Sequence, residues 1–271
     1  MMKNTRLIIS SSLFLFFLSL SYGKGFESLL FKPLTANVFE PRVGSLFETE
    51  EKKLRLDIGT SVDLMDFKQD EGNEFRLGTD FFTFTRLRSE GNFKFPVETS
   101  DYFFGINATT VGKVINTMYY ARLRIAHISS HIVDGLAHDS VLSIKPFVYS
   151  REFIDLTGAL QTGDLRLYAG LTYVFSKLPK NTNSIVPELG FDTRYIINRY
   201  LDFVGGYDFK LTGYDNNYFG VNSAQAGILF KTSDNLGLMI NLNIYEGKSM
   251  HGMFYKDYDS YASIGFQVIF Y

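Results

Sequence analysis

The sequence predicts an all-β protein, a transmembrane antiparallel up-and-down β-barrel of about twelve strands. Three observations lead to this fold class: an export signal at the N-terminus, long segments in which apolar and polar residues alternate, and a last strand that ends in Phe270 and Tyr271. A closed barrel pairs all of its backbone N–H and C=O groups within the sheet, so that alternating strands can cross a bilayer.

Residues 1–23 have the three parts of a secretory signal peptide. Lys3 and Arg6 precede an apolar run over 7–20, and the small and polar residues 21–23 follow it. The run is shorter than the roughly 20 apolar residues that a membrane-spanning helix needs, so we expect cleavage rather than an anchor. The chain has no cysteine, which excludes lipidation of an N-terminal Cys.

The composition fits an exported barrel. The chain has 27 Phe, 17 Tyr and 23 Gly but neither Cys nor Trp, which is a heavy aromatic and glycine content for a soluble domain. Loss of Lys3 and Arg6 with the signal changes the formal net charge from -2 to about -4, so we expect no nucleic-acid partner. The remaining residues fit one domain: an N-terminal extension, plug or first strand over 24–53 and the barrel over 54–271.

Apolar residues recur with a period of two along most of the mature chain. In the segment 236–244, Leu236, Leu238, Ile240, Leu242 and Ile244 alternate with Gly237, Met239, Asn241 and Asn243. Similar alternation covers about ten or more residues in the segments 54–64, 165–175 and 201–211. Strands of soluble sheets usually have about five or six residues, whereas strands that span a membrane need about nine to eleven. The longer strands therefore favour a barrel with an apolar face toward lipid.

Counting back from the C-terminus gives twelve strands, and ten is the alternative because the first two are the weakest. The predicted strands lie near 258–271, 235–246, 218–231, 199–212, 184–195, 164–178, 140–156, 117–130, 101–110, 75–88, 54–66 and 42–49. The links 232–234 and 196–198 are short and the links 247–257 and 131–139 are long, as expected for periplasmic turns and extracellular loops.

The last strand also carries a targeting pattern. Ser263, Gly265, Val268 and Phe270 have the spacing of a polar residue, a glycine and two apolar residues. This arrangement resembles the C-terminal signal that is read by the barrel insertion machinery of the outer membrane. We therefore expect the outer membrane of a Gram-negative bacterium as the location, with its lipids and the insertion machinery as partners.

Three of the four histidines, His127, His131 and His138, lie within twelve positions. The period of two places His127, Ser129 and His131 on the outer face of a strand, near its extracellular end. A hydroxyl and an imidazole two residues apart on one face can form a nucleophile and its base, here Ser129 and His127. The sequence does not identify a third group, and the residues that could support the pair are Ser130, His131, Asp134 and Asp139.

This His-x-Ser arrangement resembles the outer-membrane phospholipase A and lipid A 3-O-deacylase families, which carry His-x-Ser-Asn on the outer barrel wall. The resemblance implies His127 as base, Ser129 as nucleophile and acyl esters of lipids as substrates. It covers about five residues and departs at Ser130, where those families have Asn.

A longer resemblance covers 31–36, 127–134 and 149–152. These segments are similar to an uncharacterised family of bacterial outer-membrane proteins with an HxSSHxGD-type motif, from which this chain departs at Val133. That family implies a barrel and no assigned activity.

Charged residues on the other strand face are predicted to line the lumen. They have both signs, which indicates ion pairs across a filled or narrow lumen rather than a selective pore: Arg122, Arg124, Arg166, Asp192, Arg194 and Asp208. The sequence predicts no cofactor and no metal site, because residues four apart on a strand, such as His127 and His131, are more than about 10 Å apart along the backbone.

Two functions remain open at this point. One is a barrel with a structural, binding or narrow transport role, in which Ser and His only satisfy polar groups near the membrane surface. The other is a lipid acyl hydrolase that uses Ser129 and His127. The sequence alone leaves open whether the protein is an enzyme.

Overall fold

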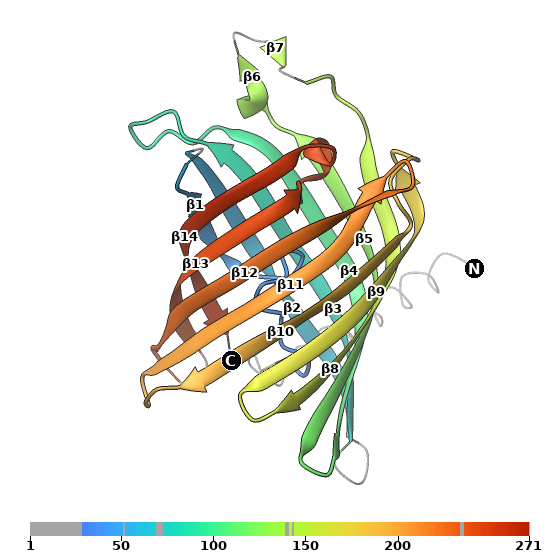
Figure 1. Cartoon of the computed structure of the whole chain (residues 1–271), viewed down its shortest axis with the longest axis vertical. Coiled ribbons are helices and arrows are strands. Elements are labelled where there is room, and N and C mark those ends of the chain that lie inside the picture. The colour runs from blue at the N-terminus through green and yellow to red at the C-terminus, as the bar shows by residue number, and fades with distance from the viewer. Residues whose placement is uncertain are drawn as a thin grey trace, which may run out of the picture.

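The computed structural model describes residues 29–50, 52–68, 73–138, 141–142, 144–233 and 236–270. The predicted signal peptide, Asp139 and Tyr271 lie outside these residues. Within them, twelve strands close into an antiparallel barrel (Figure 1), which confirms the predicted fold class and strand number. No helix in the described residues is long and apolar enough to cross a membrane.

The strands pair with their neighbours in the chain, and β1 closes the barrel against β14. Their bounds are β1 (Val43–Glu48), β2 (Lys53–Lys68), β3 (Glu74–Arg88), β4 (Val97–Val114), β5 (Thr117–Ile132), β8 (Tyr149–Thr162), β9 (Leu165–Leu178), β10 (Ile185–Ile196), β11 (Leu201–Tyr214), β12 (Asn217–Lys231), β13 (Leu236–Lys248) and β14 (Tyr258–Phe270).

One predicted strand was misplaced. The strand expected near 140–156 is β8, which begins only at Tyr149, and the residues before it form the connection 133–148. This connection holds a short 3-10 turn, Asp134–Leu136, and the two-residue strands β6 (Ala137–His138) and β7 (Val141–Leu142). Pro146 explains the late start of β8, because proline has no N–H to donate to a strand ladder.

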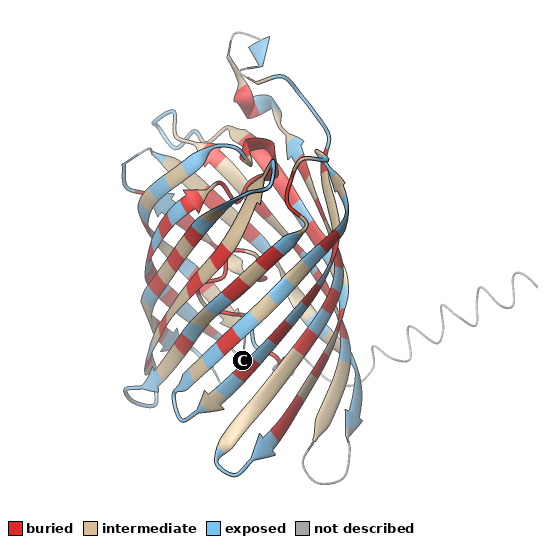
Figure 2. Cartoon of the chain, turned by 45° about the vertical axis from the view of Figure 1, so that its right-hand side comes forward, coloured by how far each residue is buried: buried red, intermediate tan, exposed pale blue. Residues whose placement is uncertain are grey.

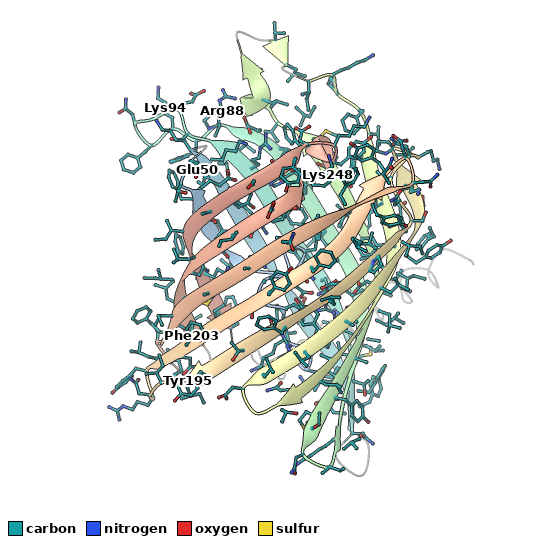
Figure 3. The ribbon with its side chains drawn as sticks, in the orientation of Figure 1. Glu50, Arg88, Lys94, Tyr195, Phe203 and Lys248 are labelled. Atoms are coloured by element: carbon teal, nitrogen blue, oxygen red, sulfur yellow. The ribbon has the colours of Figure 1, made fainter. Side chains whose placement is uncertain are left out.

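The outer wall is apolar, as the alternation predicted, and the inner wall combines the charged residues with a buried apolar cluster that includes Phe82, Phe103 and Phe153. On β13, Leu242 and Ile244 are 63% and 61% exposed, whereas Met239 and Asn241 between the outward residues are 1% exposed. Buried and exposed residues alternate along the strands around the barrel (Figure 2), and side chains project from both sides of the wall (Figure 3). An exposed apolar belt of this size needs lipid as its surroundings.

The connections differ between the two ends of the barrel. We call the end that holds the connections 89–96, 133–148 and 249–257 the loop end, and the opposite end the turn end. Glu50, Arg88, Lys94 and Lys248 mark the loop end in Figure 3, where Tyr195 and Phe203 lie toward the turn end. Long connections face the exterior in outer-membrane barrels, which gives the loop end an extracellular position.

Residues 29–42, which we call the inner segment, enter the lumen from the turn end and precede β1. Phe31, Leu34 and Glu40 are at most 3% exposed. Glu40 lies between two arginines of β5, with Oε1 at 2.5 Å from Arg122 Nη2 and at 3.0 Å from Arg124 Nη1. The inner segment therefore lies within the lumen, where Arg122 and Arg124 of the inner wall bind it.

Candidate functional site

An outer-wall cluster lies on β5 and β8 near the loop end. It consists of His127, Ser129 and His131 on β5 and of Ser150 and Glu152 on β8. The antiparallel ladder sets His127 opposite Glu152 and Ser129 opposite Ser150. Because residues of one parity share a face, all five side chains point away from the lumen, whereas Arg122, Arg124 and Ser130 of the other parity are buried inside.

Hydrogen bonds connect the cluster in two groups. His127 Nδ1 lies 2.8 Å from Glu152 Oε1, and the Ser150 hydroxyl donates to the same oxygen at 2.9 Å. The Ser129 hydroxyl lies 3.3 Å from His131 Nε2. Among the described residues, the hydrogen-bond partner of Ser129 is therefore His131 and not the predicted His127.

Two aromatic rings of β4 flank the imidazoles. The ring of Phe104 lies 4.7 Å from that of His127, and the ring of Tyr102 meets that of His131 edge-on at 5.6 Å. Both aromatic residues are also exposed on the outer wall. The rings limit the positions that the two imidazoles can adopt and give the cluster an apolar border on the β4 side.

The other predicted supporting residues lie elsewhere. The hydroxyl of Ser130 accepts a hydrogen bond from the backbone N–H of Met253 at 3.1 Å, inside the barrel. Asp134 is exposed at the start of the 3-10 turn in the 133–148 connection. The carboxylate that contacts an imidazole of the cluster is Glu152, to which sequence reasoning gave no role. The clue to Glu152 in the sequence was its place in the segment 149–152, which is one of the three segments of the longer family resemblance.

A second His–carboxylate pair lies inside the loop end and was not predicted. His251 Nδ1 is 2.7 Å from Asp101 Oδ2, and the backbone N–H of Gly252 donates to Asp101 Oδ1 at 2.9 Å. Both side chains of the pair are buried. Together with Ser130, this pair holds the connection 249–257 in the mouth of the barrel.

The six predicted lumen charges lie on the inner wall and form ion pairs. Arg166 pairs with Asp192 at 2.5 Å, and Arg194 pairs with Asp202 at 2.7 Å. Lys210 lies 2.5 Å from Asp208 and 3.2 Å from Glu188. Arg122 and Arg124 bind Glu40 of the inner segment.

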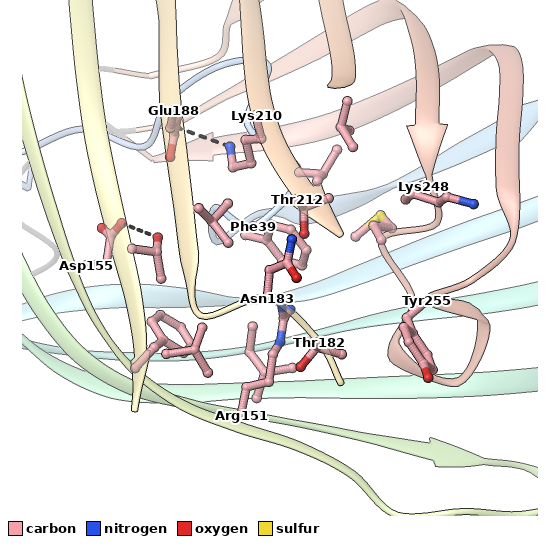
Figure 4. Close-up of a pocket in the computed structure, with 18 of the residues that line it drawn as sticks. Phe39, Arg151, Asp155, Thr182, Asn183, Glu188, Lys210, Thr212, Lys248 and Tyr255 are labelled. Carbon is pink, nitrogen blue, oxygen red and sulfur yellow. Dashed lines mark hydrogen bonds and ion pairs between the residues drawn. The ribbon is translucent and has the colours of Figure 1, made fainter. Parts of the chain in front are cut away.

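The inner segment separates two cavities of the lumen. The cavity toward the loop end has a volume of about 90 Å³ and is lined by 37–39 of the inner segment (Figure 4). The cavity toward the turn end has a volume of about 360 Å³. In the part of the chain that the structure describes, no group of three or more His, Cys, Asp or Glu side chains is arranged to hold a metal ion.

Solved structures with a similar fold are outer-membrane barrels. Outer membrane phospholipase A from Escherichia coli has a TM-score of 0.54 at 10% identity, with 84% of this chain and 90% of that chain covered. The Salmonella typhi outer membrane phospholipase, solved as a dimer with bound calcium, has a TM-score of 0.57 at 10% identity, with 90% and 94% covered. At this identity the likeness concerns the fold alone.

The barrel fold and the apolar outer wall locate the protein in the outer membrane. No curated protein matches the chain in a sequence comparison. The profile of a family described as "Protein of unknown function (DUF1207)" matches residues 94–270, which is more than half of the chain and includes the outer-wall cluster. The chain belongs to this family of outer-membrane barrels.

Proposed function

We propose that the outer-wall cluster hydrolyses acyl esters of membrane lipids, with Ser129 as the nucleophile and His127 as its base. The observation that carries this proposal is the 2.8 Å contact of His127 Nδ1 with Glu152 Oε1, on the same wall as the Ser129 hydroxyl. A carboxylate at Nδ1 keeps the proton on that nitrogen, so Nε2 is free to accept one.

The reaction follows the chemistry of serine hydrolases. Ser129 Oγ attacks the ester carbonyl carbon while its proton moves to His127 Nε2, and the leaving alcohol takes that proton when the ester C–O bond breaks. Water then attacks the acyl-Ser129 ester and gives a proton to the imidazole. The fatty acid leaves, and the proton returns to Ser129.

In the proposed mechanism, the contact of Ser129 with His131 belongs to the enzyme before a lipid binds. Among the described residues no carboxylate binds His131, whereas Glu152 orients His127. The proposed mechanism requires rotation of Ser129 about its Cα–Cβ bond, which turns the hydroxyl away from His131 and toward His127. Catalytic hydrogen bonds are often long in the absence of substrate and tighten when it binds.

The position of the cluster supports a lipid as substrate. The outer wall around it is apolar, with Leu123 and Ile125 of β5 41% and 47% exposed. A lipid therefore reaches Ser129 from the bilayer without crossing water. Solved barrels with this fold include an outer membrane phospholipase A, but the proposal for this chain rests on the cluster.

The test is release of free fatty acid from phospholipid in mixed micelles by the purified full-length barrel. Ser129→Ala and His127→Ala should lower kcat by about 1000-fold or more. Glu152→Ala should lower kcat about 10- to 1000-fold, because His127 loses its orientation. His131→Ala should stay within about tenfold of wild type.

Ser260→Ala is the matched control, because Ser260 is an exposed serine of β14. Each variant is first checked for heat-modifiable migration on gels, which reports a folded barrel. Equal hydrolysis by wild type and Ser129→Ala, or no hydrolysis by wild type, would refute the enzymatic function. Loss of hydrolysis in His131→Ala but not in His127→Ala would identify His131 as the base.

The alternative function is a barrel without catalysis, in which the cluster satisfies its own polar groups near the membrane surface. It is favoured by the fact that each of the five polar side chains already has a partner within the cluster. In that case Glu152→Ala should lower the free energy of unfolding, and the lipid profiles of all variants should be identical.

A further inference from the structure

We propose that Arg151 forms a binding site for a small organic carboxylate in the cavity at the loop end of the lumen. Arg151 belongs to β8 and faces inward, next to the outward Glu152. Its guanidinium carbon lies 5.3 Å from the ring centre of Tyr149 and 5.9 Å from that of Phe39. Strand β8, the inner segment and the connection 249–257 all contribute to the cavity.

Arg151 differs from the other luminal arginines in its partners. Arg122 and Arg124 bind Glu40, and Arg166 binds Asp192. Within the described residues, no carboxylate lies at ion-pair distance from Arg151, and its buried Nε, like those of Arg122 and Arg124, has no hydrogen-bond partner. Buried polar groups are nearly always bonded, and an unsatisfied one commonly marks the place of an ion or a water.

The carboxylates of the cavity have partners of their own. Asp155 accepts hydrogen bonds from the hydroxyls of Thr157 and Thr172 at 3.1 and 3.0 Å. Glu188 accepts from the Asn37 amide at 2.8 Å and pairs with Lys210. In Figure 4, Glu188 and Asp155 lie above Arg151, which is at the lower edge of the view. The side near Arg151 therefore carries an uncompensated positive charge.

The remaining lining sets the class of ligand. Phe153, Val174, Val186 and Val221 make much of the wall apolar. A guanidinium binds a carboxylate through two parallel hydrogen bonds, and a hydrocarbon tail can pack on the valines. An apolar cavity of about 150 Å³ holds benzene, so 90 Å³ suits a smaller acid of about three or four carbon atoms.

The rim of the cavity has the charge to attract such an anion. Lys248 lines the cavity at the loop end, and its Nζ lies 4.7 Å from the ring centre of Phe219. Lys256, in the neighbouring connection, lies 5.6 Å from the ring centre of Tyr255. Clustered cations at the mouth of a cleft raise the local concentration of anions.

The experiment measures binding of sodium propionate to the detergent-solubilised full-length barrel by saturation-transfer NMR, at constant ionic strength. Propionamide and inorganic phosphate are the comparison probes. Wild type should bind propionate saturably at millimolar concentrations, and propionamide about 10- to 100-fold more weakly, because the amide lacks the charge that strengthens the bond to Arg151. Phosphate should bind more weakly than propionate, because it has no hydrocarbon group to pack on the valines.

Arg151→Met and Arg151→Gln should each weaken propionate binding about 10- to 100-fold. Arg199→Met, an exposed arginine in the 197–200 turn, should bind as wild type does. Saturable binding that persists in both Arg151 variants, tighter binding of phosphate than of propionate, or no saturable binding by wild type would overturn the proposal. If both variants fail to fold, equal binding of propionate and propionamide by wild type would overturn it.

Discussion

Replacing Glu40 by glutamine should release the inner segment from the barrel wall. The Glu40 carboxylate is 1% exposed and binds Arg122 and Arg124. Arg124 has a second carboxylate partner in Asp80, at 3.2 Å. Arg122 depends on Glu40 and on the ring of Phe31, 4.4 Å from its guanidinium carbon. The substitution therefore leaves a buried cation of the inner wall without its anion.

The magnitude follows from two arguments. Removal of one partner from a buried ion pair typically costs about 3 to 5 kcal/mol. Burial by itself would raise the pKa of Glu40, but Arg122 and Arg124 outweigh it and lower that pKa from 4.5 to about 2. This difference corresponds to about 3 kcal/mol of favourable interaction with the charged form. Glu40→Gln should therefore cause a large loss in the free energy of unfolding.

The same pKa fixes the pH dependence. A carboxyl group whose pKa is lower in the folded state stabilises that state fully above its unfolded pKa. The contribution of Glu40 should therefore be present above pH 4.5 and be lost as the pH falls toward 2. Glu40→Gln should lack this component of the acid sensitivity.

Urea unfolding in liposomes measures the effect, with heat-modifiable migration as the readout of the folded barrel. Limited trypsin digestion at Arg42 reports separately on the inner segment, because the Arg42 side chain is 8% exposed in the wild type and should become accessible in Glu40→Gln. Glu90→Gln is the control, because Glu90 pairs with Arg88 at the exposed loop end. A free energy of unfolding within about 0.5 kcal/mol of wild type, with Arg42 still protected, would refute this role of Glu40.

Three further predictions concern other parts of the barrel. His251→Ala removes the imidazole partner of buried Asp101 at a cost of about 1 to 3 kcal/mol, so trypsin should cut faster at Lys256; unchanged cutting would contradict this role of the pair. Leu242→Arg puts a charge on the lipid-facing wall and should lower the free energy of unfolding in liposomes by about 2 to 4 kcal/mol, whereas Leu242→Phe should not. Phe270→Ala should reduce the amount of folded barrel in cells but not refolding in detergent, and an equal loss in both would argue against a targeting role of the last strand.

Much of the fold could be predicted from the sequence, because alternation along a strand is a local property. Every predicted strand has a counterpart in the barrel, and only the one near 140–156 was displaced, by a connection that contains Pro146. The same alternation correctly put His127 and Ser129 on the outer wall. Alternation does not show, however, that the inward Arg151 is left unpaired.

The sequence by itself determined the fold class, the two faces of the wall and the end of the barrel at which His127 and Ser129 lie. Only the tertiary structure decided which residues meet: Glu152 with His127, His131 with Ser129, and Glu40 with Arg122. The physical reason is that period two fixes the side of a strand on which a residue lies, whereas the register between strands and the path of the inner segment fix its neighbours. Register depends on the length of the connection 133–148 and on closure of the whole barrel, which no short stretch of sequence contains.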